Sequence, residues 1–123
     1  MRVRIDDAVW DAEVGRFGQR SPARIAAERE LPALRERGVD ASRLLACEAE
    51  GQDGTALPGL VKVYVPITDS PPSARPYGLV FKPGAGPDGA TSLAVVAFGE
   101  RHPKRGVKSV YQRAHKALHG HYP

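Results

Sequence analysis

Apolar residues change their spacing near residue 60, and the change divides the chain into a helical half and a strand-rich half. Before it, Trp10, Val14 and Phe17 recur at spacings of four and three, which is one face of an amphipathic helix. After it, residues 61–65 alternate between apolar and polar, as in a strand with one buried face. The pattern therefore predicts helices that precede a sheet.

The first half predicts a short opening strand at residues 2–5 and then a helix that begins at Ala8, capped by Asp6 or Asp7. A second helix begins at Ser21-Pro22, a capping hydroxyl followed by proline in the first turn.

The second helix is expected to end at Gly38, and Pro32 either kinks it or starts a further helix, because proline lacks an amide hydrogen. The apolar run within residues 42–49 fits a third helix or a strand.

The second half predicts three strands, at residues 60–67, 77–83 and 92–98, joined by segments rich in proline, glycine and serine at 68–76 and 84–90. Such short connections favour an antiparallel meander. We therefore expect one α+β domain over residues 1–123, with two layers. An N-terminal strand and helices pack on a three- to four-stranded, mainly antiparallel sheet, and a short C-terminal helix begins near Ser109.

The composition is that of an ordinary globular domain, with 41% apolar and 26% charged residues in 123. No apolar run approaches the roughly 20 residues that a membrane helix needs, and the first ten residues lack the apolar stretch of a signal peptide. The single cysteine, Cys47, has no intramolecular disulfide partner and is expected to be a buried, inert thiol. These features predict a cytoplasmic protein without a membrane partner.

Positive charge is concentrated in the second half. Residues 1–60 contain nine Lys and Arg against eleven Asp and Glu, whereas residues 61–123 contain nine against three. From Arg101 onward there are six basic residues, all four histidines and no acid. A one-sided positive field favours a polyanionic partner such as a nucleic acid. A solvated basic tail, or a face that docks an acidic protein, fits the same pattern.

A cluster of cations follows the last expected strand, after a turn at Gly99. Strand ends on a rigid scaffold commonly present binding groups, and such cations suit a phosphate. The cluster within eight residues comprises Arg101, His102, Lys104, Arg105 and Lys108.

A metal or a cofactor is not expected. His115 and His119 share a helix face, but no acidic or thiol ligand lies near them in the sequence. The glycine-rich segment at 84–90 lies between two strands and not before a helix, so it is expected to be a turn and not a phosphate loop.

Three segments resemble one known family in their order along the chain. Ala41–Leu44 resembles a short A-x-K-L segment, and Leu57–Val65 resembles the strand pattern x-P-x-x-Y-K-I-K-L. Gly99 and Arg101, followed by Val110–Ala114, resemble a closing G-K-R … V-Y-x-x-A pattern. The chain thus resembles the RelE/ParE toxin superfamily, and within it the RelE-type mRNA interferases.

The resemblance implies a RelE-like fold and the toxin of a bacterial type II toxin–antitoxin pair. Such toxins are ribosome-dependent endoribonucleases that cleave mRNA by metal-free attack of a 2′-hydroxyl on the adjacent phosphate. The implied partners are a cognate antitoxin, mRNA and the ribosome. The expected catalytic residues are Arg101, His102, Tyr111 and Lys62. The expected RNA-binding residues are Tyr64, Arg75, Lys82, Lys104, Arg105, Lys108 and Arg113.

The chain departs from the family pattern at three places. Tyr64 replaces a second lysine, and Gly78 replaces an arginine for which Arg75 of the preceding loop is the candidate substitute. Tyr111 follows Gly99 by twelve positions, because residues 102–106 (HPKRG) widen the turn. The widened turn is either a new substrate-gripping loop or the reason that the chain no longer cleaves RNA.

Simpler interpretations remain for the same residues: Tyr111 as a core anchor, Lys62 as a solvated strand residue and His102 as a surface histidine. Two other functions also remain open. One is a non-catalytic nucleic-acid-binding module on the same fold, and the other is a ParE-like gyrase inhibitor.

Overall fold

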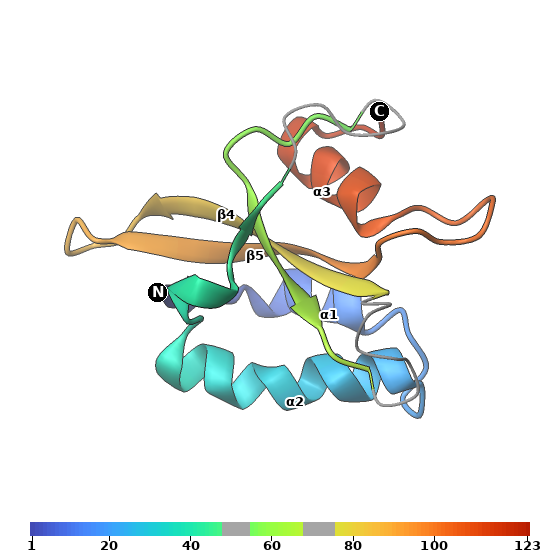
Figure 1. Cartoon of the computed structure of the whole chain (residues 1–123), viewed down its shortest axis with the longest axis horizontal. Coiled ribbons are helices and arrows are strands. Elements are labelled where there is room, and N and C mark those ends of the chain that lie inside the picture. The colour runs from blue at the N-terminus through green and yellow to red at the C-terminus, as the bar shows by residue number, and fades with distance from the viewer. Residues whose placement is uncertain (48–54, 68–75) are drawn as a thin grey trace.

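The computed structural model describes residues 1–47, 55–67 and 76–123. Across these residues three α-helices and five strands form an α+β domain around one mixed sheet (Figure 1). The expected connection at 68–75, with the candidate residue Arg75, lies outside the described residues.

The sheet has the order β1-β5-β4-β3-β2, in which β1 is parallel to β5 and every other pairing is antiparallel. The predicted meander is therefore confirmed, and β1 joins its edge as a fourth strand. The fifth strand, β2, exceeds the expected three to four strands. It lies within the ambiguous run at 42–49, whose described residues contain the end of a 3-10 turn (Ala41–Arg43) and then this strand. The strands are β1 (Arg2–Arg4), β2 (Leu45–Ala46), β3 (Val61–Val65), β4 (Tyr77–Ala85) and β5 (Thr91–Glu100).

The helices begin where the sequence predicts: α1 spans Asp7–Val14, α2 spans Pro22–Arg37 and α3 spans Val110–His119. Their caps are Asp6, whose carboxylate accepts from Ala8 N, and Ser21 and Ser109, whose hydroxyls accept from the third residue of each helix. Pro32 lies inside α2, which continues to Arg37 as one helix.

The expectation of two layers is wrong, because the sheet is covered on both faces. Helices α1 and α2 lie on one face and α3 lies on the other (Figure 1). Strand residues Val80 and Ala97 are fully buried on the second face, where they pack with Val110 and Ala114 of α3. A helix with so apolar an inner side requires a sheet face to bury it.

Two paired glycines seat the start of α3 on the sheet. Gly78 of β4 pairs with Gly99 of β5, and Val110 lies over both: a Cβ at Gly78 or Gly99 would be 3.6 or 3.7 Å from Val110 side-chain atoms. The side chain of Arg101 also passes over Gly78, where a Cβ would lie 3.6 Å from its Cγ. The absence of side chains here brings Val110, and Tyr111 after it, close to the strand ends.

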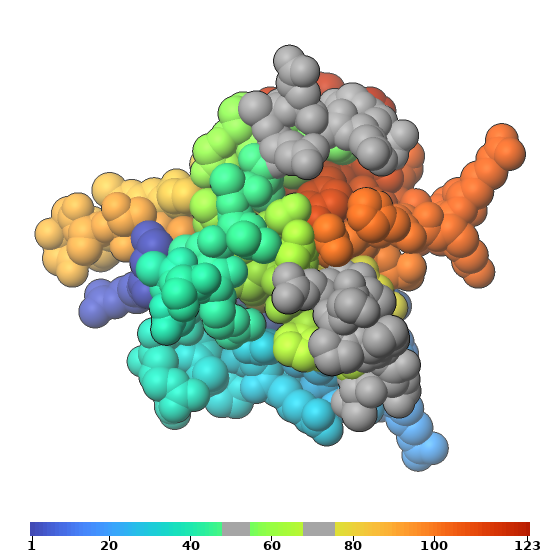
Figure 2. Space-filling view, viewed as in Figure 1, coloured from blue at the N-terminus to red at the C-terminus, as the bar shows by residue number. Residues whose placement is uncertain are grey.

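The loop between β5 and α3 projects from the body of the domain (Figures 1 and 2). Its residues 102 and 104–108 are exposed. None of the described helices combines the length and the apolar character that crossing a bilayer requires.

Gly38, the residue directly after α2, packs closely against the backbone of Met1, and substituting it tests this contact. Its φ is +69°, and an added Cβ would lie 1.8 Å from the Met1 carbonyl oxygen. We expect Gly38→Ala to lower the free energy of unfolding in urea by at least about 2 kcal/mol, because backbone strain and a steric clash combine. The matched control Gly59→Ala has φ +81° but no described atom within 4 Å, so strain alone should cost about 1 kcal/mol. Equal losses in the two variants would contradict the clash.

Candidate functional site

Three expected catalytic residues meet at one oxygen atom. Lys62 Nζ donates to the Tyr111 hydroxyl oxygen at 3.1 Å, and Arg101 Nε donates to the same oxygen at 3.0 Å. Lys62 comes from β3, Arg101 directly follows β5, and Tyr111 lies in the first turn of α3. Since both donors are cations, the hydroxyl oxygen lies in a strongly positive environment, and its own hydrogen remains to donate elsewhere.

The ring of Tyr64 packs against both cations of this arrangement. Its ring centroid lies 4.2 Å from the Arg101 guanidinium carbon and 5.5 Å from Lys62 Nζ. Lys62 and Tyr64 are two residues apart in β3 and therefore project from the same face of the strand. Lys62 Nζ also lies 4.7 Å from the centroid of the Tyr111 ring. Two aromatic faces therefore attract the two cations, an interaction of about 0.5–2 kcal/mol each. Tyr64, expected to bind RNA, contacts the two cations that form the site.

Lys62 is held as an ammonium ion. Partial burial by itself lowers the pKa of Lys62. The hydrogen bond from Lys62 to Tyr111 outweighs this effect, together with the negative charge that Tyr111, Tyr64 and Cys47 carry when they ionise. The pKa of Lys62 therefore lies above its ordinary value. At neutral pH this residue supplies positive charge and is not a proton acceptor.

A cavity of about 610 Å³ opens beside these residues. Strand and helix residues form one side, and the loop at 102–107 forms the other. Among the described parts of the chain, no acidic residue lines it. Its lining comprises Cys47, Thr55, Leu57, Lys62, Arg101, His102, Pro103, Lys104, Arg105, Gly106, Val107, Ser109, Tyr111 and Gln112.

Cys47 is buried in the wall of the cavity, as the sequence predicts, with 7% of its surface exposed. Burial raises the pKa of its thiol, and the nearby Lys62 only partly opposes this. The thiol is therefore protonated at neutral pH and is not a nucleophile.

The widened turn supplies three of the expected residues to the cavity: His102, Lys104 and Arg105. The turn closes with Val107 N donating to the Lys104 carbonyl at 3.2 Å, and Gly106 has φ +91°. The side chains of this loop are exposed, whereas Arg101 and Tyr111 are half-buried. The loop thus adds exposed positive charge to a site held by strands and a helix.

Four of the expected RNA-binding residues that the structure describes are not part of the cavity lining: Tyr64, which contacts the site from β3, and Lys82, Lys108 and Arg113. Lys82 is exposed on β4, beyond the last residue that pairs with β3. Lys108 lies against the ring of Tyr122. Arg113 is bound to a carboxylate at the opposite side of α3. The sequence shows that Lys82, Lys108 and Arg113 are basic, but not the direction in which each side chain points.

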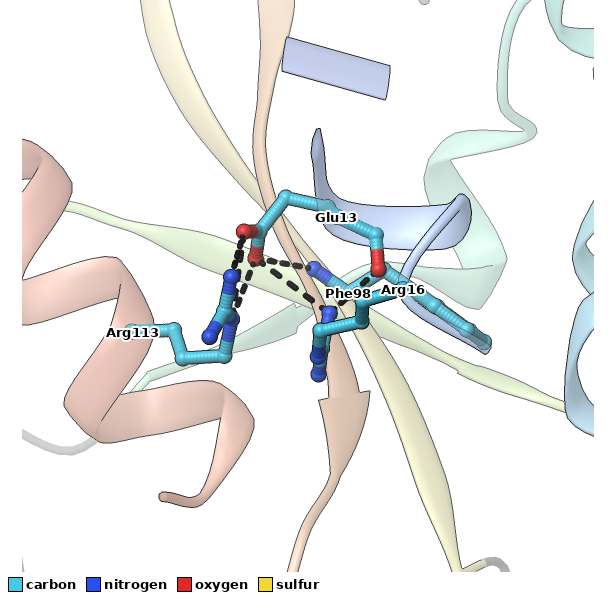
Figure 3. Close-up of polar contacts among 4 residues, drawn as sticks. All are labelled: Glu13, Arg16, Phe98 and Arg113. Atoms are coloured by element: carbon cyan, nitrogen blue, oxygen red, sulfur yellow. Dashed lines mark hydrogen bonds and ion pairs between the residues drawn. The ribbon is translucent and has the colours of Figure 1, made fainter. Parts of the chain in front are cut away.

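The carboxylate that binds Arg113 belongs to Glu13, which sequence analysis missed (Figure 3). Arg113 Nε donates to both carboxylate oxygens at 3.0 and 3.1 Å, and its Nη2 donates to Oε2. Phe98 N of β5 also donates to Oε1, at 3.2 Å. Glu13 therefore joins α1, β5 and α3. The available signal was an acidic residue within the apolar stripe of Trp10, Val14 and Phe17.

Arg16 completes this cluster (Figure 3). Its Nη1 lies 3.9 Å from Glu13 Oε1, and its Nη2 would be 2.4 Å from a Cβ at Gly99. Burial, followed by repulsion from Arg113, lowers the pKa of Arg16, and the Glu13 carboxylate opposes that shift. Two guanidinium groups thus share one buried carboxylate, and the three side chains together keep a net positive charge.

The rings of His115, His119 and His121 lie together, with centroids 4.4–6.3 Å apart. His115 Nδ1 is 3.0 Å from the His121 carbonyl oxygen. Within the described residues, no group of three or more His, Cys, Asp or Glu side chains is arranged to hold a metal ion.

Comparison with protein-family models, with curated proteins and with solved structures finds no match for this chain.

The Glu13 cluster is testable by unfolding. Glu13→Ala leaves Arg113 and the Phe98 amide without their acceptor, and should lower the free energy of unfolding by about 3 kcal/mol. Glu28→Ala is the matched control, because Glu28 forms a surface ion pair with Arg24 at 2.8 Å; its loss should cost less than about 1 kcal/mol. Urea denaturation followed by circular dichroism measures both. A Glu13→Ala loss no larger than the control would show that the cluster contributes nothing to stability.

Proposed function

We propose that this chain is the toxin of a type II toxin–antitoxin pair, a ribosome-dependent endoribonuclease that cleaves mRNA in the cytoplasm. The observation that carries the proposal is the convergence of Lys62 and Arg101 on the Tyr111 hydroxyl, beside a basic cavity. The family resemblance supplies the reaction, the antitoxin and the ribosome, and the geometry of these three residues supports it.

In the proposed reaction the 2′-oxygen of a ribose forms a bond to the adjacent phosphorus, and the bond from phosphorus to the 5′-oxygen breaks. The products are a 2′,3′-cyclic phosphate and a 5′-hydroxyl. One proton must leave the 2′-hydroxyl, and one must reach the departing 5′-oxygen. The phosphate gains negative charge in the transition state, so fixed cations stabilise it.

Arg101 and Lys62 supply that positive charge. The guanidinium of Arg101 binds phosphate oxygens in a planar, bidentate manner, whereas the Lys62 ammonium acts as a point charge. The aromatic ring of Tyr64 and the hydroxyl of Tyr111 hold both cations before substrate binds. Preorganised charge of this kind needs no rearrangement during the reaction.

Tyr111 and His102 transfer the protons. Tyr111 donates its hydroxyl hydrogen to the 5′-oxygen, and the hydrogen bonds from Lys62 and Arg101 stabilise the phenolate that forms. His102, at the wall of the cavity, accepts the proton of the 2′-hydroxyl. Exchange with water restores both groups after product release.

Induced expression in a bacterial host tests the proposal directly. The wild-type chain should arrest growth and produce new 5′ ends in abundant mRNAs, detected by primer extension. Tyr111→Phe removes the proton donor but keeps the ring, and should reduce cleavage by about 10²-fold or more. Arg37→Ala, which removes an exposed arginine at the end of α2 and outside the cavity, is the matched control and should cleave normally.

Folded wild-type protein that produces neither growth arrest nor new 5′ ends would overturn the proposal. Salt-sensitive RNA binding without cleavage would then indicate a non-catalytic binding module. DNA-damage signalling without mRNA cleavage would indicate a gyrase inhibitor.

The raised pKa of Lys62 leads to a second prediction, which concerns how the cleavage rate depends on pH. Because the pKa of Lys62 is raised, its ammonium persists between about pH 6 and 9 and gives no change in rate across that range. In a purified ribosome assay, Lys62→Met should lower the cleavage rate by about 10²-fold at every pH, and Lys62→Arg should retain most activity. If Lys62→Met instead removed one limb of the pH–rate profile, Lys62 would be the general base and the assignment would be wrong.

A further inference from the structure

Two lysines outside the cavity converge on one aromatic ring. Lys108 Nζ and Lys116 Nζ each lie 4.8 Å from the ring centroid of Tyr122. The negative face of the ring attracts both ammonium groups but does not neutralise them. Both lysines are exposed, and across the described residues neither forms an ion pair with a carboxylate.

The C-terminal residues hold Tyr122 in place. Gly120, with φ +84°, ends α3 and redirects the chain. His115 Nδ1 then lies 3.0 Å from the His121 carbonyl oxygen, and His121 Nδ1 lies 3.0 Å from the Tyr122 carbonyl oxygen. The ring that gathers the two lysines is therefore anchored to α3.

This cluster continues the surface of the cavity. Lys108 directly precedes Ser109, which lines the cavity, as does Gln112. Lys116 lies four residues after Gln112 and hence on the same side of α3, one turn farther along. A ligand that leaves the cavity beside Gln112 therefore meets Lys116 and Lys108 next.

We propose that Lys108, Lys116 and Tyr122 form a second phosphate-binding site, which binds the backbone of single-stranded RNA beyond the phosphate in the cavity. The inference rests on the proposed function in one respect, that the cavity takes RNA. Lysine ammonium groups are point charges that bind phosphate without choosing sequence. A single strand can bend from the cavity around the start of α3, whereas a duplex is far stiffer; duplex DNA, for example, has a persistence length of about 50 nm.

The site is tested by binding of RNA that cannot be cleaved. Fluorescent single strands of three and nine nucleotides, 2′-O-methylated throughout, are titrated at several salt concentrations and followed by anisotropy. For Lys108→Gln/Lys116→Gln we expect about tenfold weaker binding of the nonamer and a log–log salt slope shallower by about 1.4, because two phosphate contacts are lost. The trimer, which occupies the cavity alone, should bind as tightly as it does to the wild-type chain.

Two double variants serve as controls. Lys108→Arg/Lys116→Arg keeps both charges and should preserve nonamer binding. Arg29→Gln/Arg37→Gln removes two exposed cations elsewhere, both on α2 at the other face of the sheet, and should leave nonamer affinity within about twofold of wild type.

Unchanged nonamer affinity in Lys108→Gln/Lys116→Gln would overturn the inference, as would equal losses for trimer and nonamer, or no RNA binding by the wild-type chain. If these substitutions abolished binding of a polyglutamate peptide but not of RNA, the surface would dock an acidic protein and the inference would be wrong. Cleavage is measured separately: a chain that binds the nonamer through these lysines but cleaves no mRNA would sustain this inference and refute the proposed nuclease.

Discussion

The carboxylate of Glu13 holds the two faces of the domain together at one edge of the sheet. Strand β1 pairs only with residues 92–94 of β5, and beyond it the Phe98 amide donates to Glu13 instead of to a strand. The same carboxylate binds Arg113 of α3, and the hydrogen bond from Arg113 to Glu13 raises the pKa of Arg113. A buried carboxylate requires such partners, because an unpaired charge is costly to desolvate. Helix α3, and therefore Tyr111, depends on this contact for its orientation.

Close packing at the strand ends places the rest of the site. Gly78 and Gly99 leave room for Val110 on the sheet, and Arg101 crosses Gly78 to reach the Tyr111 hydroxyl. The groups that meet at this hydroxyl thus come from a strand, a strand end and a helix. Rigid elements hold their side chains more precisely than loops do. The widened turn adds its cations around this centre without disturbing it.

Helices and strands were predicted well where the residues that determine them lie close together in the sequence. The caps at Ser21 and Ser109 and the alternation of residues 61–65 lie within a few residues of what they determine. Pro32 did not break α2, because the apolar contacts of Ala26, Ala27 and Leu34 with the core outweigh one lost hydrogen bond. Two layers were expected because the C-terminal helix is short and rich in basic residues, and its few apolar positions did not indicate a face that packs on the sheet.

By itself, the sequence closely determined where the three helices and the strands β1, β3, β4 and β5 begin. It also showed the concentration of positive charge after Gly99 and, through a family resemblance, made Lys62, Arg101 and Tyr111 candidate site residues. Only the tertiary structure decided which cations share a site. Lys62 meets Tyr111 across 49 positions, and Arg113 meets Glu13 across 100. Spacing along a chain specifies a side chain's direction only within its own helix or strand. Contacts between elements depend on how those elements pack, and so Arg113 is bound to Glu13 and not to the cavity.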